Sequence, residues 1–320
     1  MNTDILISNI TNPTLLFFLL GIIASLVKSD LEIPQPSVKF ISLYLLFSIG
    51  FKGGQELAHS GINQEIIYSL LYALVISAVI PFYLFYLALP KFGPSNAGAV
   101  AAAYGSVSAV TFVSAANFLE ASQIEYGGHM VAVMAFMEAP AIIVGVSLMK
   151  RYQKNVATQE SLGSVVFHSL TNGSVLMIVG SLIIGIIADT KQAEGIKPFT
   201  NDIFKGFLAI FLLEMGMITA KRIKGCFDYG KASVLIALLV PLLNGVIVAY
   251  TSQWITLDVG NRFMFAILAA SASYIAVPAS MRLAAPEADP GLYIPMALGV
   301  TFPLNITLGM PLFLMIIQMS

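Results

Sequence analysis

The chain has 320 residues, of which 58% are hydrophobic and only 10% are charged. Soluble domains carry about 25% charged residues, so a chain with a mean hydropathy of +0.86 has too little polar surface to cover a water-soluble globule. Its net charge of −1 lacks the basic excess typical of nucleic-acid binding. One cysteine and three scattered histidines exclude an intramolecular disulfide and a thiolate metal cluster. We therefore expect an integral membrane protein without a resident cofactor.

Ten apolar segments are long enough to cross a bilayer, for which a helix needs roughly 20 mostly apolar residues. Short loops with turn and charge signals separate them, such as 91–94 and 287–290. The sequence thus predicts an all-α membrane protein with about ten transmembrane helices and no separate soluble domain. The expected spans are 13–27, 38–57, 66–89, 97–119, 130–149, 170–188, 203–220, 232–254, 263–283 and 293–317.

Basic residues predict the orientation, because they are retained on the cytoplasmic side of a membrane. Most of the 16 Lys and Arg residues lie in loops that follow the odd-numbered spans. This bias places both termini on the extracytoplasmic side of the cell (inner) membrane. No Lys or Arg precedes the first apolar segment, so we expect it to be a membrane helix and not a cleaved signal peptide.

The two halves of the chain resemble each other. An offset of about 165 residues aligns the stretch 103–108 (Ala-Tyr-Gly-Ser-Val-Ser) with 268–273 (Leu-Ala-Ala-Ser-Ala-Ser). Each half holds five expected spans, an odd number, so the second half inserts upside down relative to the first, as in many secondary transporters. We expect two inverted five-helix repeats, 1–155 and 156–320, that form one transmembrane unit.

The fourth and ninth expected helices carry a break in mid-span. The stretch 101–111 has Gly beside Ser and Thr, and the stretch 269–280 has Pro beside Ser. A broken backbone persists in lipid only where protein or a water-filled cavity satisfies its polar groups. Two half-helices meeting near the midplane offer N–H groups to a small anion and carbonyl groups to a cation such as Na+. These small residues could instead only pack helices together, but their matched positions favour a binding site.

Two acidic residues lie within expected spans, where carboxyl groups are costly and often belong to ion or proton paths. Glu138 precedes Ala139-Pro140, and its counterpart in the second half, Asn305, is also an oxygen donor. We expect both to help bind a coupling cation. The alternative to cation binding is a structural role, in which the carboxyl group is only hydrogen-bonded. We favour this structural role for Glu214, the second acidic residue.

These segments resemble the sodium-dependent bicarbonate permease family over most of the chain. The resemblance implies a gate domain and a core domain, elevator-like movement, and bicarbonate and Na+ held between the two breaks. It also implies a homotrimer and regulation by a PII-like cytoplasmic protein. The motifs that carry it are Asn12-Pro13-Thr14-Leu15, Ile49-Gly50 with Gly53-Gly54, Gly105-x-Val107-Ser108-x-x-Thr111, Phe136-Met137-Glu138-x-Pro140, Met215-Gly216-Met217, Ala269-Ala270-Ser271-x-Ser273, Pro278, Arg282 and Pro311-Leu312-Phe313.

The chain departs from that family in the ninth helix. Tyr274 stands where the bicarbonate transporters carry Asp, and Ala276 and Val277 replace a Ser and a Gly. A lost carboxylate removes a strong ligand for a hard cation. The long acidic insert of those relatives, which follows their fifth helix, is only a short loop here.

The sequence favours a secondary active transporter, a Na+-coupled symporter of a small anion such as bicarbonate. The alternatives are an organic-anion symporter or a cation/proton exchanger of the same fold, and a membrane sensor without transport. No catalytic constellation is present, so we do not expect an enzyme. The candidate substrate-binding residues are Gly105, Ser106, Ser108, Ser271, Ala272, Ser273 and Tyr274, and the candidate Na+ ligands are Ser108, Thr111, Glu138, Ser273 and Asn305.

Overall fold

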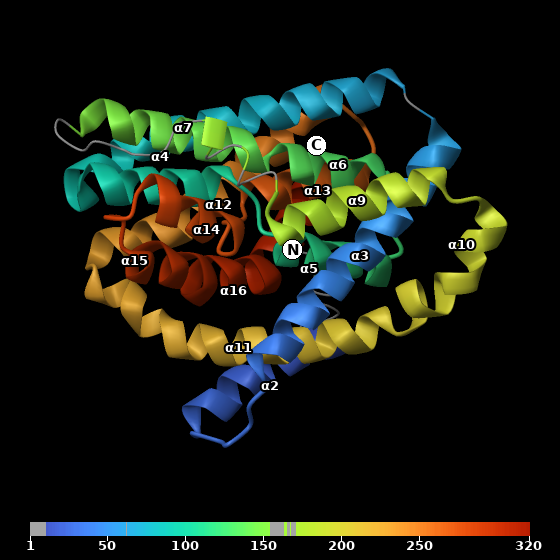
Figure 1. Cartoon of the computed structure of the whole chain (residues 1–320), viewed down its shortest axis with the longest axis horizontal. Coiled ribbons are helices and arrows are strands. Elements are labelled where there is room, and N and C mark those ends of the chain that lie inside the picture. Colours follow the sequence, from blue (N-terminus) through green and yellow to red (C-terminus); the bar gives the residue numbers. More distant parts are fainter. Residues whose placement is uncertain (1–10, 62, 154–162, 165–166, 168–170) are drawn as a thin grey trace.

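A computed structural model describes the chain except for residues 1–10, 62, 154–162, 165–166 and 168–170. The elements of the described part are all helical (Figure 1). The boundary expected between residues 155 and 156, and the expected start of the sixth span at residue 170, lie outside the described residues.

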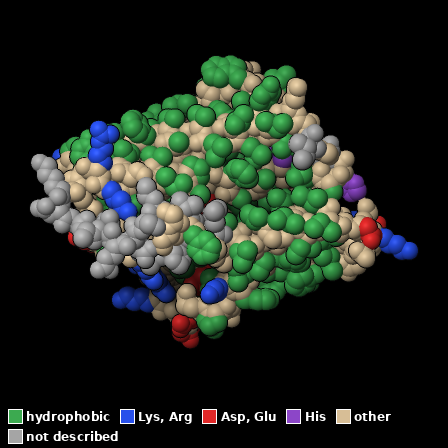
Figure 2. Space-filling model, turned by 45° about the horizontal axis from the view of Figure 1, so that its top comes forward, with side chains coloured by type: hydrophobic (Ala, Val, Ile, Leu, Met, Phe, Trp, Pro, Cys, Tyr) green, Lys and Arg blue, Asp and Glu red, His purple; other side chains and the backbone are tan. Residues whose placement is uncertain are grey.

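Five helical segments of the described chain are long and apolar enough to cross a membrane. Figure 2 shows a face whose middle is covered by hydrophobic side chains, while charged ones lie toward its left and right ends. Such a surface suits a hydrocarbon solvent, which confirms an all-helical membrane protein; the number of ten spans stays a prediction. The five segments are Gln64–Ala121, His129–Tyr152, Thr190–Asp228, Lys231–Trp254 and Pro290–Met319, and shorter apolar helices are Pro13–Leu26, Gly173–Ile187 and Val259–Ala269.

Two helix pairs make extensive contacts, α3 (Gln35–Ser60) with α9 (Gly173–Ile187) and α2 (Pro13–Leu26) with α11 (Phe204–Asp228). We call these four helices the first group, with the short α10 (Thr190–Lys197) leading into α11. The remaining helices are the second group, against which α11 also packs. The second group comprises α4 (Gln64–Gly105), α5 (Ala109–Ala121), α6 (His129–Phe136), α7 (Glu138–Tyr152), α12 (Lys231–Thr251), α13 (Val259–Ala269), α14 (Ala276–Ala284), α15 (Pro290–Pro295), α16 (Phe302–Leu304) and α17 (Met310–Met319).

Local sequence explains where helices begin and bend. Asn12 Oδ1 accepts a hydrogen bond from the backbone N–H of Thr14 at 3.0 Å and caps α2, whose first residue is a proline, as is common at this position. Gly93 has a positive φ of 72°, a conformation that glycine adopts without a steric cost. It bends α4, which therefore contains the third expected span and the first half of the fourth.

Glycines allow two helix pairs of the first group to pack closely. A Cβ on Gly54 of α3 would overlap the carbonyl of Leu182 in α9, and a Cβ on Gly216 of α11 would overlap the carbonyl of Phe18 in α2. Backbones approach this closely in membranes only where side chains are small. In Figure 1, α2 and α11 cross at one edge of the molecule, and the first part of α4 lies at the opposite edge.

The tenth expected span differs from the single helix that the sequence predicts. It contains two π-helical segments, Met296–Thr301 and Asn305–Gly309. Such wider turns are often found at functional sites. The second one begins at Asn305, whose side-chain Nδ2 donates to the carbonyl of Ala270 at 2.7 Å. The irregular backbone thus brings this amide to the end of α13.

Candidate functional site

Both predicted helix breaks are present. Helix α4 ends at Gly105 and α5 begins at Ala109, while α13 ends at Ala269 and α14 begins at Ala276. A Cβ on Gly105 would overlap the ring of Pro81 in the same long helix, so only glycine allows this close approach.

The backbone between the halves of each broken helix is bonded to the other break. The N–H of Ser108 donates to Ser271 Oγ at 3.0 Å, and the N–H of Ser273 donates to the carbonyl of Ala103 at 2.7 Å. Ser108 Oγ in turn accepts from the N–H of Thr111 at 3.2 Å and caps α5. Polar groups freed by the breaks therefore find partners in protein, as burial in a membrane requires.

Two buried oxygen atoms near the breaks have no hydrogen-bond partner among the described residues: Ser106 Oγ and Asn305 Oδ1. Ser106 is 1% exposed and Asn305 is fully buried. Buried polar atoms are nearly always bonded, so an unpartnered pair calls for an explanation such as a bound ion or water.

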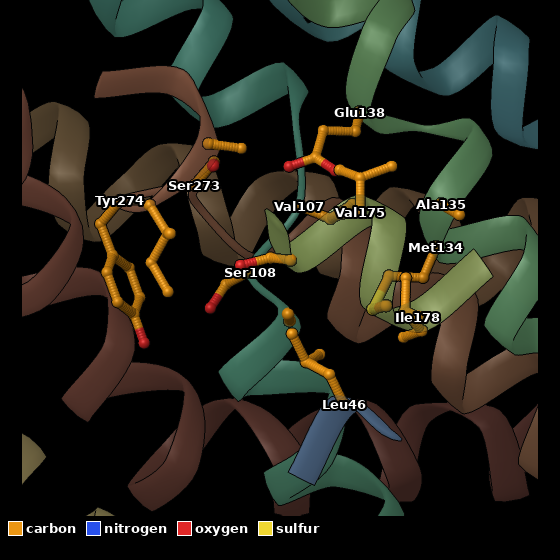
Figure 3. A pocket seen from close by; sticks show the side chains of 14 residues that line it. Leu46, Val107, Ser108, Met134, Ala135, Glu138, Val175, Ile178, Ser273 and Tyr274 are labelled. Carbon is orange, nitrogen blue, oxygen red and sulfur yellow. The ribbon is translucent and has the colours of Figure 1, made fainter. Parts of the chain in front are cut away.

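A cavity lies where the two breaks face the first helix group (Figure 3). Its volume of about 30 Å³ is enough for one or two water-sized molecules. The Glu138 carboxyl group points into it, toward the break that carries Ser108 (Figure 3). The lining residues are Leu46, Val107, Ser108, Ala109, Met134, Ala135, Glu138, Ser174, Val175, Ile178, Ser273, Tyr274, Ile275 and Ala276.

The first residues of two helices, α5 and α14, line this cavity. Ser108 and Ala109 lie at the start of α5, and Ile275 and Ala276 lie at the start of α14. The positive end of the helix dipole makes such a terminus favourable for an anion. Two of the N–H groups there, those of Thr111 and Val277, already donate to Ser108 Oγ and Ser273 Oγ. The Glu138 carboxyl group, which can bind a cation or a proton, lies at the same cavity. Groups suited to an anion and to a cation are therefore neighbours there.

The structure brings together only part of the predicted site. Ser108, Glu138, Ser273 and Tyr274 line the cavity. The Tyr274 ring points away from Glu138 (Figure 3), and its hydroxyl lies 3.7 Å from Met215 Sδ in α11. Predicted site residues that lie outside the lining are Gly105, Ser106, Thr111, Ser271, Ala272 and Asn305.

Sequence reasoning missed the opposite wall of the cavity. Leu46 comes from α3, and Ser174, Val175 and Ile178 come from α9. These residue types are common in any membrane helix, so no local signal could have singled them out.

A larger polar vestibule of about 750 Å³ lies between α3, the end of α5 and the start of α11. Three glutamates and one lysine line it: Glu56, Glu120, Glu125 and Lys52. Glu120 also pairs with Lys205 at 2.9 Å. Tyr126, in the loop after α5, completes the wall, and burial raises the pKa of its phenol, so the phenol is neutral at physiological pH.

No group of three or more His, Cys, Asp or Glu side chains in the described part of the chain could hold a metal ion. A cation at the central cavity would meet the hydroxyl groups and the one carboxylate of its lining, among them those of Ser108, Ser273 and Glu138. Oxygen ligands of this kind suit a hard cation.

Two interrupted helices that meet at one cavity in a helical membrane protein are typical of secondary transporters. The chain belongs to the Na+-dependent bicarbonate transporter superfamily, which it matches over residues 13–318. Membership of this family makes it a transporter and not an enzyme. A comparison with curated proteins found no match.

Proposed function

We propose that this protein is a Na+-coupled symporter of a small anion, with bicarbonate as the first candidate. The observation that carries the proposal is that the starts of α5 and α14 line one cavity together with Ser108 and Ser273. Backbone N–H groups and serine hydroxyls would hold the anion without any basic side chain. The family to which the chain belongs supports this substrate and this coupling ion.

The size of the cavity favours a small substrate. A volume of about 30 Å³ cannot enclose an organic anion unless the walls separate. Bicarbonate has four non-hydrogen atoms and requires only a modest widening. The small volume therefore supports an inorganic anion over the organic anions that the sequence leaves open.

The cation would use oxygen atoms beside the anion. Glu138, Ser108 and Ser273 line the cavity and are the ligands we propose there. Thr111 and Asn305, expected as further ligands from the sequence, lie outside its lining, and their part in cation binding stays a prediction. Each ion then lowers the cost of burying the other, so the two sites are energetically coupled.

Two helix pairs support the inverted repeat. An offset of 165 residues relates α3 to α11 and α2 to α9 in sequence. The close glycine contacts join α3 to α9 and α2 to α11, which is the pairing that a pseudo-two-fold axis between the halves requires. We propose that these four helices form the gate domain and the remaining helices form the core domain.

Elevator movement would carry the loaded core domain past the gate domain. The gate side of the cavity is mostly apolar, with Leu46, Val175 and Ile178, and such a wall offers few hydrogen bonds to break during sliding. From the resemblance we also infer a homotrimer and a PII-like cytoplasmic regulator. From the distribution of basic residues we infer extracytoplasmic termini in the inner membrane.

The test is uptake of labelled bicarbonate into sealed proteoliposomes, with and without an inward Na+ gradient. We expect the Na+ gradient to drive uptake. We also expect the substitutions Ser108→Ala and Ser273→Ala to reduce it. Ser280→Ala, a buried serine of α14 outside the cavity, should leave it unchanged. No uptake by folded protein would overturn bicarbonate as the substrate, and no flux of any anion would indicate a sensor.

A second candidate is proton coupling through Glu138, the acidic residue of the cavity lining. A pH gradient would then drive uptake without Na+, and Glu138→Gln would abolish that response. The two gradients are imposed separately, so the same vesicles distinguish the candidates.

A further inference from the structure

A second, smaller cavity lies between α2, α5, α11 and the π-helical segment Asn305–Gly309. Its volume is about 20 Å³, which holds a single water-sized occupant. Its lining combines uncharged polar groups with an apolar remainder: Asn12, Thr14, Leu15, Ser114, Asn117, Phe118, Leu212, Ile306 and Met310.

The polar groups of this cavity leave oxygen lone pairs available. Thr14 Oγ1 donates to Asn12 Oδ1 at 2.6 Å and accepts from Asn117 Nδ2 at 3.1 Å. Ser114 Oγ donates to the carbonyl of Val110 at 2.9 Å. Since each hydroxyl proton is already bonded, the free positions of Thr14 and Ser114 are acceptors.

Asn117 completes this oxygen set. Its side-chain nitrogen is the donor to Thr14 Oγ1, and its Oδ1 accepts no hydrogen bond from the residues that the structure describes. Thr14 is 8% exposed, and Ser114 and Asn117 are each 7% exposed. The Asn117 amide keeps a second N–H proton, but the three acceptor oxygens of this buried set outnumber it. Such a set suits a small cation better than an anion.

The cavity lies beside a series of oxygen-bearing side chains that winds around α5. They recur every third residue, each turned about 60° around the helix from the one before, and three separate cavities meet them in order. Glu120 and Asn117 line the vestibule, Asn117 and Ser114 line the second cavity, and Ser108 lines the central cavity. Thr111 stands between Ser114 and Ser108, with its backbone N–H bonded to Ser108 Oγ.

Charge at the vestibule also favours a cation. Its lining carries three glutamates and one lysine, and one of these glutamates, Glu120, is paired with Lys205, which leaves an excess of one carboxylate. The negative end of the α5 dipole points the same way. An excess of carboxylates raises the local concentration of cations and lowers that of anions.

We propose that the second cavity, bounded by Thr14, Ser114 and Asn117, is a sodium subsite between the vestibule and the central cavity. This inference rests on the Na+ coupling of the proposed function. Since Asn117 belongs to α5 and Thr14 to α2, the subsite spans the proposed core and gate domains. Na+ would then reach the central cavity by a path of its own. This path is separate from the helix N-termini that we propose to hold the anion.

The test is a Na+ titration of the purified full-length chain in detergent, with K+ keeping the ionic strength constant. The readout is the thermal unfolding midpoint as a function of Na+ concentration, in the absence of any anion substrate. Ser114→Ala and Asn117→Leu each remove one oxygen ligand. We expect either variant to raise the Na+ concentration of half-maximal stabilisation about fivefold.

The matched control is Ser122→Ala. Ser122 Oγ donates to the carbonyl of Phe118, the same bond that Ser114 Oγ makes to Val110, but Ser122 lines neither the vestibule nor the second cavity. Its Na+ titration should equal that of the unmodified chain.

Two outcomes contradict the inference in different ways. If Ser108→Ala weakens the Na+ response while Ser114→Ala and Asn117→Leu titrate like the unmodified chain, the subsite is wrong and Na+ coupling stands. If the unmodified chain shows no Na+-dependent stabilisation, the coupling ion of the proposed function is wrong, and the subsite fails with it.

Discussion

The backbone N–H of Ser108 donates to Ser271 Oγ at 3.0 Å, across 163 residues of sequence. Each residue belongs to the break of a different helix, so this bond joins the two halves of the chain at the candidate site. A shift of one break therefore moves or breaks a bond to the other, and the two breaks form one structural unit.

Ser271→Ala tests this unit. The substitution removes the acceptor and leaves the Ser108 N–H buried without a partner, which costs about 1–3 kcal/mol. We expect a lower unfolding midpoint in detergent and reduced uptake. Ser280→Ala, which loses the bond that the hydroxyl donates to the carbonyl of Ala276 in the same helix, should have a smaller effect on both. Equal effects of the two variants would contradict the prediction.

Glu138→Gln tests the carboxylate of the central cavity. If Glu138 is a cation ligand, loss of its charge weakens the interaction by about tenfold or more, seen as a higher Na+ concentration for half-maximal uptake. Glu214→Gln is the control, because Glu214 is also buried in a long helix but lies outside the cavity lining. An unchanged Na+ dependence of Glu138→Gln would remove Glu138 from the cation site.

Gly54→Ala tests the contact between α3 and α9. The added methyl group would overlap the carbonyl of Leu182, and such overpacking costs about 1–3 kcal/mol. We expect a lower unfolding midpoint. Gly180→Ala on α9 adds the same group where no atom lies within 4 Å, so its midpoint should not fall. Equal midpoints for the two variants would show that α3 and α9 can move apart at little energetic cost.

Arg262→Met tests a buried cation of α13. Its guanidinium group donates to the carbonyl of Ala249 in α12 at 2.9 Å and to that of Ile317 in α17 at 3.5 Å. In this variant two carbonyls near helix ends lose a donor, which lowers the free energy of unfolding by about 1–3 kcal/mol. The stability of Arg262→Lys should lie between those of the unmodified chain and Arg262→Met. Arg151→Met, at the exposed end of α7, is the control. A more stable Arg262→Met would mean that burial of the charge outweighs its bonds.

Tyr229 links the loop after α11 to Asp289. Its hydroxyl donates to the Asp289 carboxylate, and this bond raises the pKa of Tyr229 to about 12, above the value near 10 of an unfolded chain. The folded state thus holds the proton more tightly, so the stabilisation is present below pH 10 and is lost as the pH rises toward 12. The midpoint difference between the unmodified chain and Tyr229→Phe should shrink over that interval. A constant difference would show that the bond does not contribute.

Sequence alone predicted the helix breaks well and the cavity only in part. Gly105 followed by two serines marks the first break, because glycine and small polar residues signal local backbone conformation. Ser108, Glu138, Ser273 and Tyr274, predicted from their positions in or near the breaks, line one cavity, and their roles in binding stay predictions. Asn305 lies outside that lining, and the π-helical segment that begins with it has no signal in the local sequence.

The sequence by itself determined that this is a helical membrane protein with two interrupted helices, since hydropathy and backbone-breaking residues act locally. Only the tertiary structure decided which oxygen atoms share a cavity. Leu46 and Val175, which close the central cavity, and Thr14 and Asn117, which meet in the second one, come from helices far apart in the chain. Their meeting depends on how glycine contacts set the distance and register of whole helices, and no short stretch of sequence encodes that packing.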